Sequence, residues 1–146
     1  MIADSVAGEW ENSLPKTDGI YRLIENTMNR TNREMRIRAI AALGTSGDPR
    51  AVQSLIDCCQ DTSPEVRLRA IEGLQNLRSG RSVEALVGRI TDRKELPEIR
   101  QRAAAALAAT RCFSSMEALQ NRCDDPGEDA ALRTFIRQEL DRLHSR

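Results

Sequence analysis

The chain has 146 residues, a length typical of one compact unit, and its 22 basic residues balance its 22 acidic residues to a formal net charge of zero. This balance excludes the strong overall electrostatic field that nucleic-acid and membrane-surface binders commonly carry. Local charged patches on the surface are still possible. The sequence has no apolar run of about 18 residues and does not open on a basic segment followed by an apolar stretch. We therefore expect no membrane span, no signal peptide and a cytoplasmic location.

Residues 1–16 stand apart because they do not share the repeat pattern of the rest of the chain. Trp10 and Leu14 are large apolar side chains in this segment. We therefore expect an N-terminal cap that folds over the first helices, with a disordered leader as the alternative. The remaining residues, 17–146, are predicted to form one repeat domain.

A segment of about thirty residues recurs in phase along this domain. Val52, Val83 and Met116 each begin an apolar pattern with helical spacing, and they follow one another at intervals of 31 and 33 residues. A second helical pattern follows each of them, and strand-like alternation is absent from the sequence. We predict an all-α solenoid of about four helical pairs, at residues 17–47, 48–79, 81–111 and 114–145.

The second pair shows the expected helix signals most clearly. Asp48 and Pro49 suit a helix start, because Asp accepts from free backbone amides and Pro lacks a donor that would have no partner there. Gly80 is expected to end the second helix in the left-handed conformation. One apolar face of the first helix consists of Val52, Leu55, Ile56 and Cys59.

The four cysteines lack both the paired spacing of a metal site and a secreted context. Cys59 and Cys123 occupy an apolar position of the first helices, where a thiol packs as a small hydrophobic group. Cys112 falls in a turn. We therefore expect buried, unreactive thiols at Cys59 and Cys123 and a more accessible one at Cys112.

These patterns resemble HEAT-like repeats, of the short kind found in phycobilisome-lyase-type proteins. The resemblance covers about residues 18–143 and implies an α-α superhelix. It rests on the following residues: Leu43-Gly44, Gly47-Asp48-Pro49-Arg50-Ala51-Val52, Leu55, Asp61, Val66-Arg67, Ala70 and Leu74.

The resemblance also implies a ladder of ion pairs that ties adjacent repeats together. In the family an Asp in the turn and an Arg in the second helix form it, and a structural role is expected for these residues. The first repeat has Arg30 at the Asp position, so no ladder pair is expected there. The predicted pairs are Asp61 with Arg67, Asp92 with Arg100, and Asp125 with Arg133.

In this class of repeat the second helices line the concave side. Helical geometry then places Leu68 away from the core, with Ile37 at the equivalent position of the preceding repeat. An alternative is that neighbouring helices cover both side chains. The predicted groove residues are Ile37, Arg38, Leu68, Arg69, Gln101 and Arg102.

Catalytic chemistry has few candidate residues in this sequence. His144 is the one histidine, and the HEAT-type hydroxylases bind iron through several His-Glu pairs. No Ser, Cys or Thr has a histidine base that the fold would bring near it. We therefore predict no enzyme, and no catalytic residue, metal or cofactor.

The function predicted from these observations is a non-enzymatic scaffold or adaptor that binds another protein or a peptide segment in the concave groove. Apolar contacts at Ile37 and Leu68 would supply affinity, and the flanking arginines would orient the partner. A bilin-lyase-like subunit is one alternative. The other is nucleic-acid binding through an arginine stripe, which the few aromatic residues and interspersed glutamates disfavour.

Overall fold

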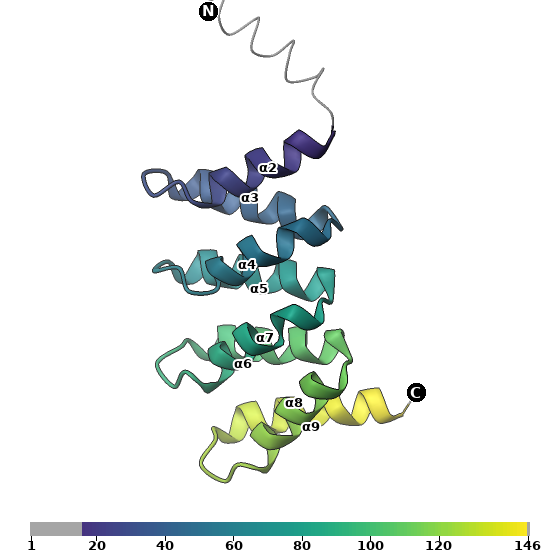
Figure 1. Ribbon diagram of the computed structural model, residues 1–146. Coiled ribbons are helices and arrows are strands. Elements are labelled where there is room, and N and C mark those ends of the chain that lie inside the picture. Colours follow the sequence, from purple (N-terminus) through teal and green to yellow (C-terminus); the bar gives the residue numbers. More distant parts are fainter. Residues whose placement is uncertain (1–15, 146) are drawn as a thin grey trace, which may run out of the picture.

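The computed structural model describes residues 16–145, which form a stack of helical pairs (Figure 1). The described residues contain helices and turns and no strand, so the predicted all-α solenoid is confirmed. The cap or leader predicted for residues 1–16 lies outside the described residues, apart from Lys16 at the start of the first helix.

Each pair consists of a first and a second helix that run in opposite directions (Figure 1). Short 3-10 turns at Pro49–Ala51 and Gly80–Ser82 lead into the first helices of the second and third pairs. The pairs are α2 (Lys16–Thr27) with α3 (Arg33–Thr45), α4 (Val52–Cys58) with α5 (Pro64–Leu77), α6 (Val83–Thr91) with α7 (Pro97–Thr110), and α8 (Phe113–Asp124) with α9 (Ala130–His144).

The helix starts follow the chemistry of free amides. Asp48 accepts a hydrogen bond from the Arg50 backbone amide, and Pro49 follows it, as predicted for the start of the second pair. Pro64 and Pro97 open the second helices α5 and α7, where the preceding residue gives no side-chain cap. These starts fix where the helices begin and therefore help to set the register of the repeats.

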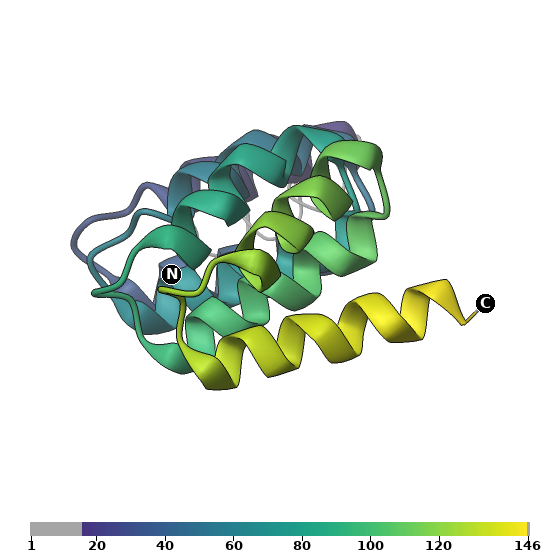
Figure 2. The ribbon, with the colours of Figure 1, turned by 90° about the horizontal axis from the view of Figure 1, so that it is seen from below.

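The helices form two layers, with the first helices in one and the second helices in the other (Figure 2). The second helices of adjacent pairs pack closely, and the first helices of adjacent pairs make fewer contacts. Gly44 on α3 and Gly73 on α5 allow the closest approach, because a Cβ added at Gly44 would lie only 2.7 Å from the Gly73 Cα atom. The second helices are therefore the tightly packed inner layer of the stack.

Two arginines end second helices in the left-handed conformation, where glycine is the usual residue. Arg78 has φ 52° and Arg111 has φ 55°, and Gly47 has φ 68° after α3. The prediction that Gly80 plays this part is wrong, because Gly80 begins the following 3-10 turn. A left-handed residue with a Cβ atom costs about 1–2 kcal/mol, so these two positions are strained.

Two edges of the stack carry the loops. We call the side with the turns between the first and second helix of each pair the turn edge. The opposite side, where the chain passes from one pair to the next, is the connection edge (Figure 1). Among the described helices, none is long and apolar enough to span a membrane.

Candidate functional site

A row of arginines lies along the turn edge, one near the start of each second helix. Each guanidinium donates to a backbone carbonyl of its own pair, and three of the four also meet a carboxylate of the following pair. The four arginines are Arg36, Arg67, Arg100 and Arg133.

Arg67 shows the complete arrangement. Its Nη1 donates to the Asp61 carbonyl oxygen at 2.8 Å, within the same pair. Its Nε and Nη2 donate to the two carboxylate oxygens of Glu95, both at 2.8 Å. Arg89 donates to the same carboxylate at 2.9 Å. Glu95 is therefore a buried carboxylate held by two arginines, and it joins the second pair to the third.

The next junction repeats this chemistry. Arg100 donates through Nε to the Ile90 carbonyl oxygen at 2.7 Å and through Nη2 to Glu128 at 2.5 Å. Arg122 lies 3.6 Å from the second oxygen of Glu128. The Glu128 side chain is 1% exposed, as is that of Glu95, so both carboxylates depend on these arginines for their stability in the interior.

The structure pairs the ladder residues differently from the sequence interpretation, because Arg67 and Arg100 bind Glu95 and Glu128 of the following pair. Asp92 lies beside Arg89 at 3.7 Å, and Asp125 lies beside Arg122 at 3.5 Å, both within their own pair. The two longer turns place a glutamate three residues after each of these aspartates. The side chain of that glutamate points inward and forms an ion pair with the ladder arginine of the preceding pair.

The first pair also has a ladder contact, which the sequence interpretation denied. Arg36 Nε lies 3.4 Å from Asp61 Oδ2 of the second pair. Because the carboxylate comes from the following pair, Arg30 in the first turn does not prevent this contact. The last ladder arginine, Arg133, donates to the Cys123 carbonyl oxygen at 3.1 Å and has no carboxylate partner among the described residues.

Burial alone would raise the pKa of Glu95, but hydrogen bonds from Arg67 and the Leu96 amide outweigh it and hold the pKa below its ordinary value. The same balance applies to Glu128, where the Asp129 amide and Arg100 outweigh burial and lower the pKa. Both carboxylates are therefore ionised at neutral pH.

The residues predicted to line the concave groove lie on the inner layer, but they do not form an open apolar anchor. Ile37 and Leu68 are half-buried and pack against the core. Arg69 binds Glu72 at 3.0 Å, and Arg102 approaches the same glutamate at 4.0 Å. Of the remaining two, Arg38 is exposed and Gln101 is half-buried.

A basic pocket lies further along the inner layer, at the connection edge. Its volume is about 300 Å³. Its floor is made by small side chains of α7, and three arginines surround it. We call it the arginine pocket, and its lining residues are Gln75, Arg78, Ala105, Ala108, Ala109, Arg111, Arg142 and Leu143.

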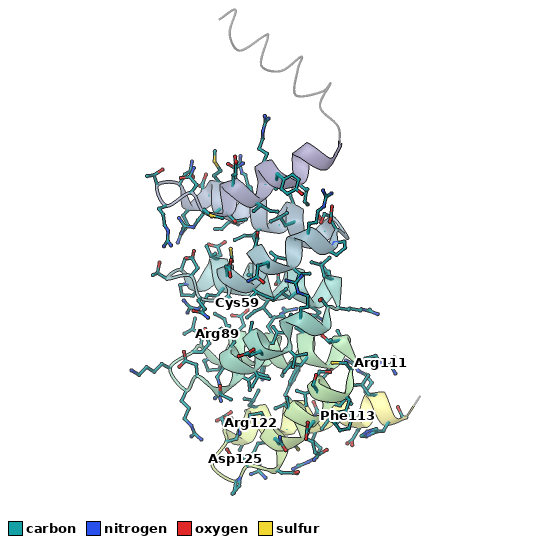
Figure 3. All side chains as sticks on the ribbon, in the orientation of Figure 1. Cys59, Arg89, Arg111, Phe113, Arg122 and Asp125 are labelled. Atoms are coloured by element: carbon teal, nitrogen blue, oxygen red, sulfur yellow. The ribbon has the colours of Figure 1, made fainter. Side chains whose placement is uncertain are left out.

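Two of these arginines have no acidic partner within the part of the chain that the structure describes. Arg78 and Arg111 are exposed and make no ion pair there, whereas Arg142 pairs with Glu139. No acidic residue lines the pocket. Figure 3 shows Arg111 at the connection edge, and Arg89, Arg122 and Asp125 at the turn edge. The arginine pocket is therefore a local positive site on a chain of zero net charge.

The described residues offer few side chains that could hold a metal ion. His144 is the only histidine of the sequence and is exposed near the end of α9. Within residues 16–145, no three His, Cys, Asp or Glu side chains are placed to hold a metal ion. These residues do not fit an iron site built from several His-Glu pairs.

The cysteine side chains differ in burial and in acidity. Cys59 is 1% exposed, and burial raises its pKa to about 12. Cys112 is half-buried at the start of α8, where hydrogen bonds from Ser114 and Ser115 lower its pKa to about 7. The sequence did not indicate this lowered pKa, because it depends on local hydroxyl groups and on the helix start.

We predict that a thiol reagent at pH 7.5 and native conditions modifies Cys112 first, because the thiolate is the reactive form and Cys112 holds the largest share of it. Cys59 and Cys123 should stay unmodified until the chain unfolds. Peptide mapping by mass spectrometry after timed quenching measures the order. Modification of Cys59 as fast as Cys112 would contradict the packing described here.

Stacked helical pairs with an inner layer of second helices and a ladder between pairs define an α-solenoid repeat protein. The family model for HEAT repeats matches residues 20–108, which is more than half of the chain. The chain belongs to the HEAT repeat family, as the sequence resemblance predicted. HEAT repeats generally mediate protein interactions. No curated protein matches the sequence.

Among solved structures, human deoxyhypusine hydroxylase in complex with glycerol is similar, with a TM-score of 0.76 and 26% sequence identity. The match covers 87% of this chain and 44% of the hydroxylase chain, so this chain spans less than half the length of that enzyme. The prediction of a non-enzymatic scaffold is corrected by this finding, because a similar chain of the same fold is an enzyme.

Proposed function

We propose that this chain recognises an acidic segment of a partner protein, and that the arginine pocket holds the segment's carboxylates. The observation that carries this is the pair of unpartnered arginines, Arg78 and Arg111, beside a pocket without an acidic residue. Arginine suits the task, because its planar guanidinium binds a carboxylate through two parallel hydrogen bonds. Such recognition is compatible with an enzyme, since the similar hydroxylase shares the fold.

The strained backbone at these arginines supports the same function. Both residues occupy the position where Gly47 follows α3, and glycine would remove the strain. As arginines, they project charge from the ends of α5 and α7, where the partial negative charge of the helix end also favours a cation. The small side chains of Ala105 and Ala108 leave room for a partner's backbone between them.

Two of the predicted groove residues, Arg69 and Arg102, lie on the same helices as this site. Arg102 lies on the same helix as the alanine floor, and Arg69 lies on α5 with Arg78. Glu72 approaches both flanking arginines and reduces their free charge. We therefore place the main charged contacts with the partner at the arginine pocket. Arg69 and Arg102 make weaker contacts beside it. Four free cysteines fit the cytoplasmic location proposed for this interaction.

A fluorescein-labelled peptide of alternating glutamate and leucine tests the proposal. It should bind the full chain at low ionic strength and more weakly as salt rises, because its contacts are charged. The double variant Arg78→Gln with Arg111→Gln should weaken binding by at least about tenfold, the effect of losing charged hydrogen bonds. Fluorescence anisotropy measures the affinity.

The matched control is Arg33→Gln with Arg93→Gln, which removes the same charge at the turn edge. This pair should leave the affinity almost unchanged. A peptide with glutamine in place of glutamate should bind poorly to every variant. Equal losses in both double variants would mean that only overall charge matters, and the proposal would then be wrong.

A further inference from the structure

A second cavity lies at the turn edge between the first two pairs, far along the fold from the arginine pocket. Its volume is ≈ 440 Å³. The turns after α2 and α4 form its mouth, and side chains of α3 and α4 form its wall. Its polar lining residues include Arg30, Arg36, Ser54, Asp57 and Asp61.

Arg36 is the unusual group in this cavity. It is 8% exposed, and its Nη1 donates to the Asn29 carbonyl oxygen at 3.0 Å. Its buried Nε has no hydrogen-bond partner, although Asp61 Oδ2 lies 3.4 Å away. The equivalent Arg67 donates both Nε and Nη2 to Glu95 at 2.8 Å. A buried N–H without an acceptor is unfavourable, so Arg36 favours a ligand that supplies one.

The turn length explains why this junction differs. The turns before α7 and α9 place Glu95 and Glu128 on the ladder arginines. Asp61 precedes the start of α5 by three residues, whereas Asp92 and Asp125 precede the starts of α7 and α9 by five. The shorter segment offers only Asp61, whose Oδ1 already accepts from the Ser63 amide. The residue three positions after Asp61 is Pro64, so this segment brings no glutamate to Arg36.

The charges around the cavity select the chemistry of the ligand. Two arginines, Arg30 and Arg36, face two aspartates, Asp57 and Asp61, so the lining has no net charge. A free carboxylate would accept from Arg36 but would also approach both aspartates. A carboxamide avoids this repulsion, because its oxygen accepts from Arg36 while its N–H groups donate to an aspartate. Ser54 is buried and its hydroxyl makes no hydrogen bond within the described residues, so it can bond to either the oxygen or the N–H groups of the carboxamide.

We propose that this cavity binds a carboxamide group, with the amide oxygen on Arg36 Nε and the amide N–H groups on Asp57 or Asp61. The group can come from a small amide or from a glutamine or asparagine side chain of a protein. The site is separate from the arginine pocket, so either can fail without the other.

Three ligands of equal size and different charge test the assignment on the full chain: butyramide, butyrate and butylammonium. Titration followed by ¹H–¹⁵N NMR should show saturable shifts for butyramide at Ser54, Cys58 and the Arg36 Nε–H group. The two charged ligands should show much smaller shifts. A blocked glutamine peptide that binds more tightly than butyramide identifies a protein side chain as the source, and equal binding identifies a small amide; both results support the carboxamide assignment.

The variant Asp57→Asn should weaken butyramide binding about fivefold, because it replaces a charged acceptor with a neutral one. Asp124→Asn is its matched control, because Asp57 and Asp124 each accept a hydrogen bond from the glutamine four residues before it, Gln53 or Gln120. Ser54→Leu should fill the cavity and abolish binding. If Ser54→Leu does not fold, the comparison of Asp57→Asn with Asp124→Asn still tests the assignment. Preference for butyrate, or no saturable shift with any ligand, would overturn the assignment.

Discussion

Substitution of Glu95 by alanine should lower the free energy of unfolding by about 3–5 kcal/mol, because it leaves Arg67 and Arg89 largely buried without their carboxylate. Urea unfolding followed by circular dichroism measures the change. Glu117→Ala is the control, since Glu117 is exposed and makes no ion pair within the described residues; its effect should stay within about 0.5 kcal/mol. Equal effects for the two variants would show that the ladder does not stabilise the stack.

Removing the charge of Glu95 should also change how the free energy of unfolding depends on pH. The pKa of Glu95 is lowered in the folded chain, so its contribution is present above the ordinary glutamate pKa of about 4.3 and is lost as pH falls through the folded value. Wild-type stability should therefore decline below about pH 4.3, and Glu95→Gln should decline less over that range. A decline of the same size in both chains would contradict the lowered pKa.

Gly44→Ala should destabilise the chain by about 1–3 kcal/mol, the usual effect of overpacking a close contact. The added Cβ would lie 2.7 Å from the Gly73 Cα atom, and backbone cannot move aside as a flexible side chain can. Gly88→Ala is the control on α6, where nothing lies within 4 Å of an added Cβ. It should stabilise the chain by about 0.5–1 kcal/mol, because glycine is unfavourable inside a helix.

Thermal unfolding of the two alanine variants shows both signs in one experiment. Opposite shifts in the unfolding midpoint are expected, downward for Gly44→Ala and upward for Gly88→Ala. An unchanged midpoint for Gly44→Ala would mean that α3 and α5 lie further apart than described. The inner layer would then not be the tightly packed side of the stack.

The repeat architecture could be predicted from the sequence because each helix carries its own signals. The interval between Val52, Val83 and Met116 sets the period, and Asp48 with Pro49 marks a helix start that the structure reproduces. These signals act over a few residues and depend little on the rest of the fold. The order of helices then follows from the short turns between them.

The partners in the ladder could not be predicted in the same way. Asp92 and Asp125 align with Asp61 in the sequence, but alignment does not show which carboxylate a turn directs inward. A signal was present, since Glu95 and Glu128 are also 33 residues apart and occur only in the two longer turns. Which pair supplies the carboxylate is a property of the stacking between repeats.

The candidate site was missed for a related reason. An arginine in a sequence does not indicate a left-handed backbone. The left-handed end of α5 was therefore predicted at Gly80, whereas the structure places it at Arg78. The helical wheel predicted that Leu68 points away from the core, but it contained no information on how closely α5 and α7 pack. That packing leaves Leu68 half-buried and puts the open pocket at the other end of the same helices.

Recognition of an acidic segment by the arginine pocket is tested most directly by mapping where the glutamate–leucine peptide binds. We expect its addition to the ¹⁵N-labelled full chain to shift the NMR signals of Arg78, Arg111 and Ala108, with saturation at the same peptide concentration for all three. Signals of Arg33 and Arg93 at the turn edge should stay in place. Shifts centred on the turn edge, or spread evenly over the exposed arginines, would contradict a binding site at this pocket.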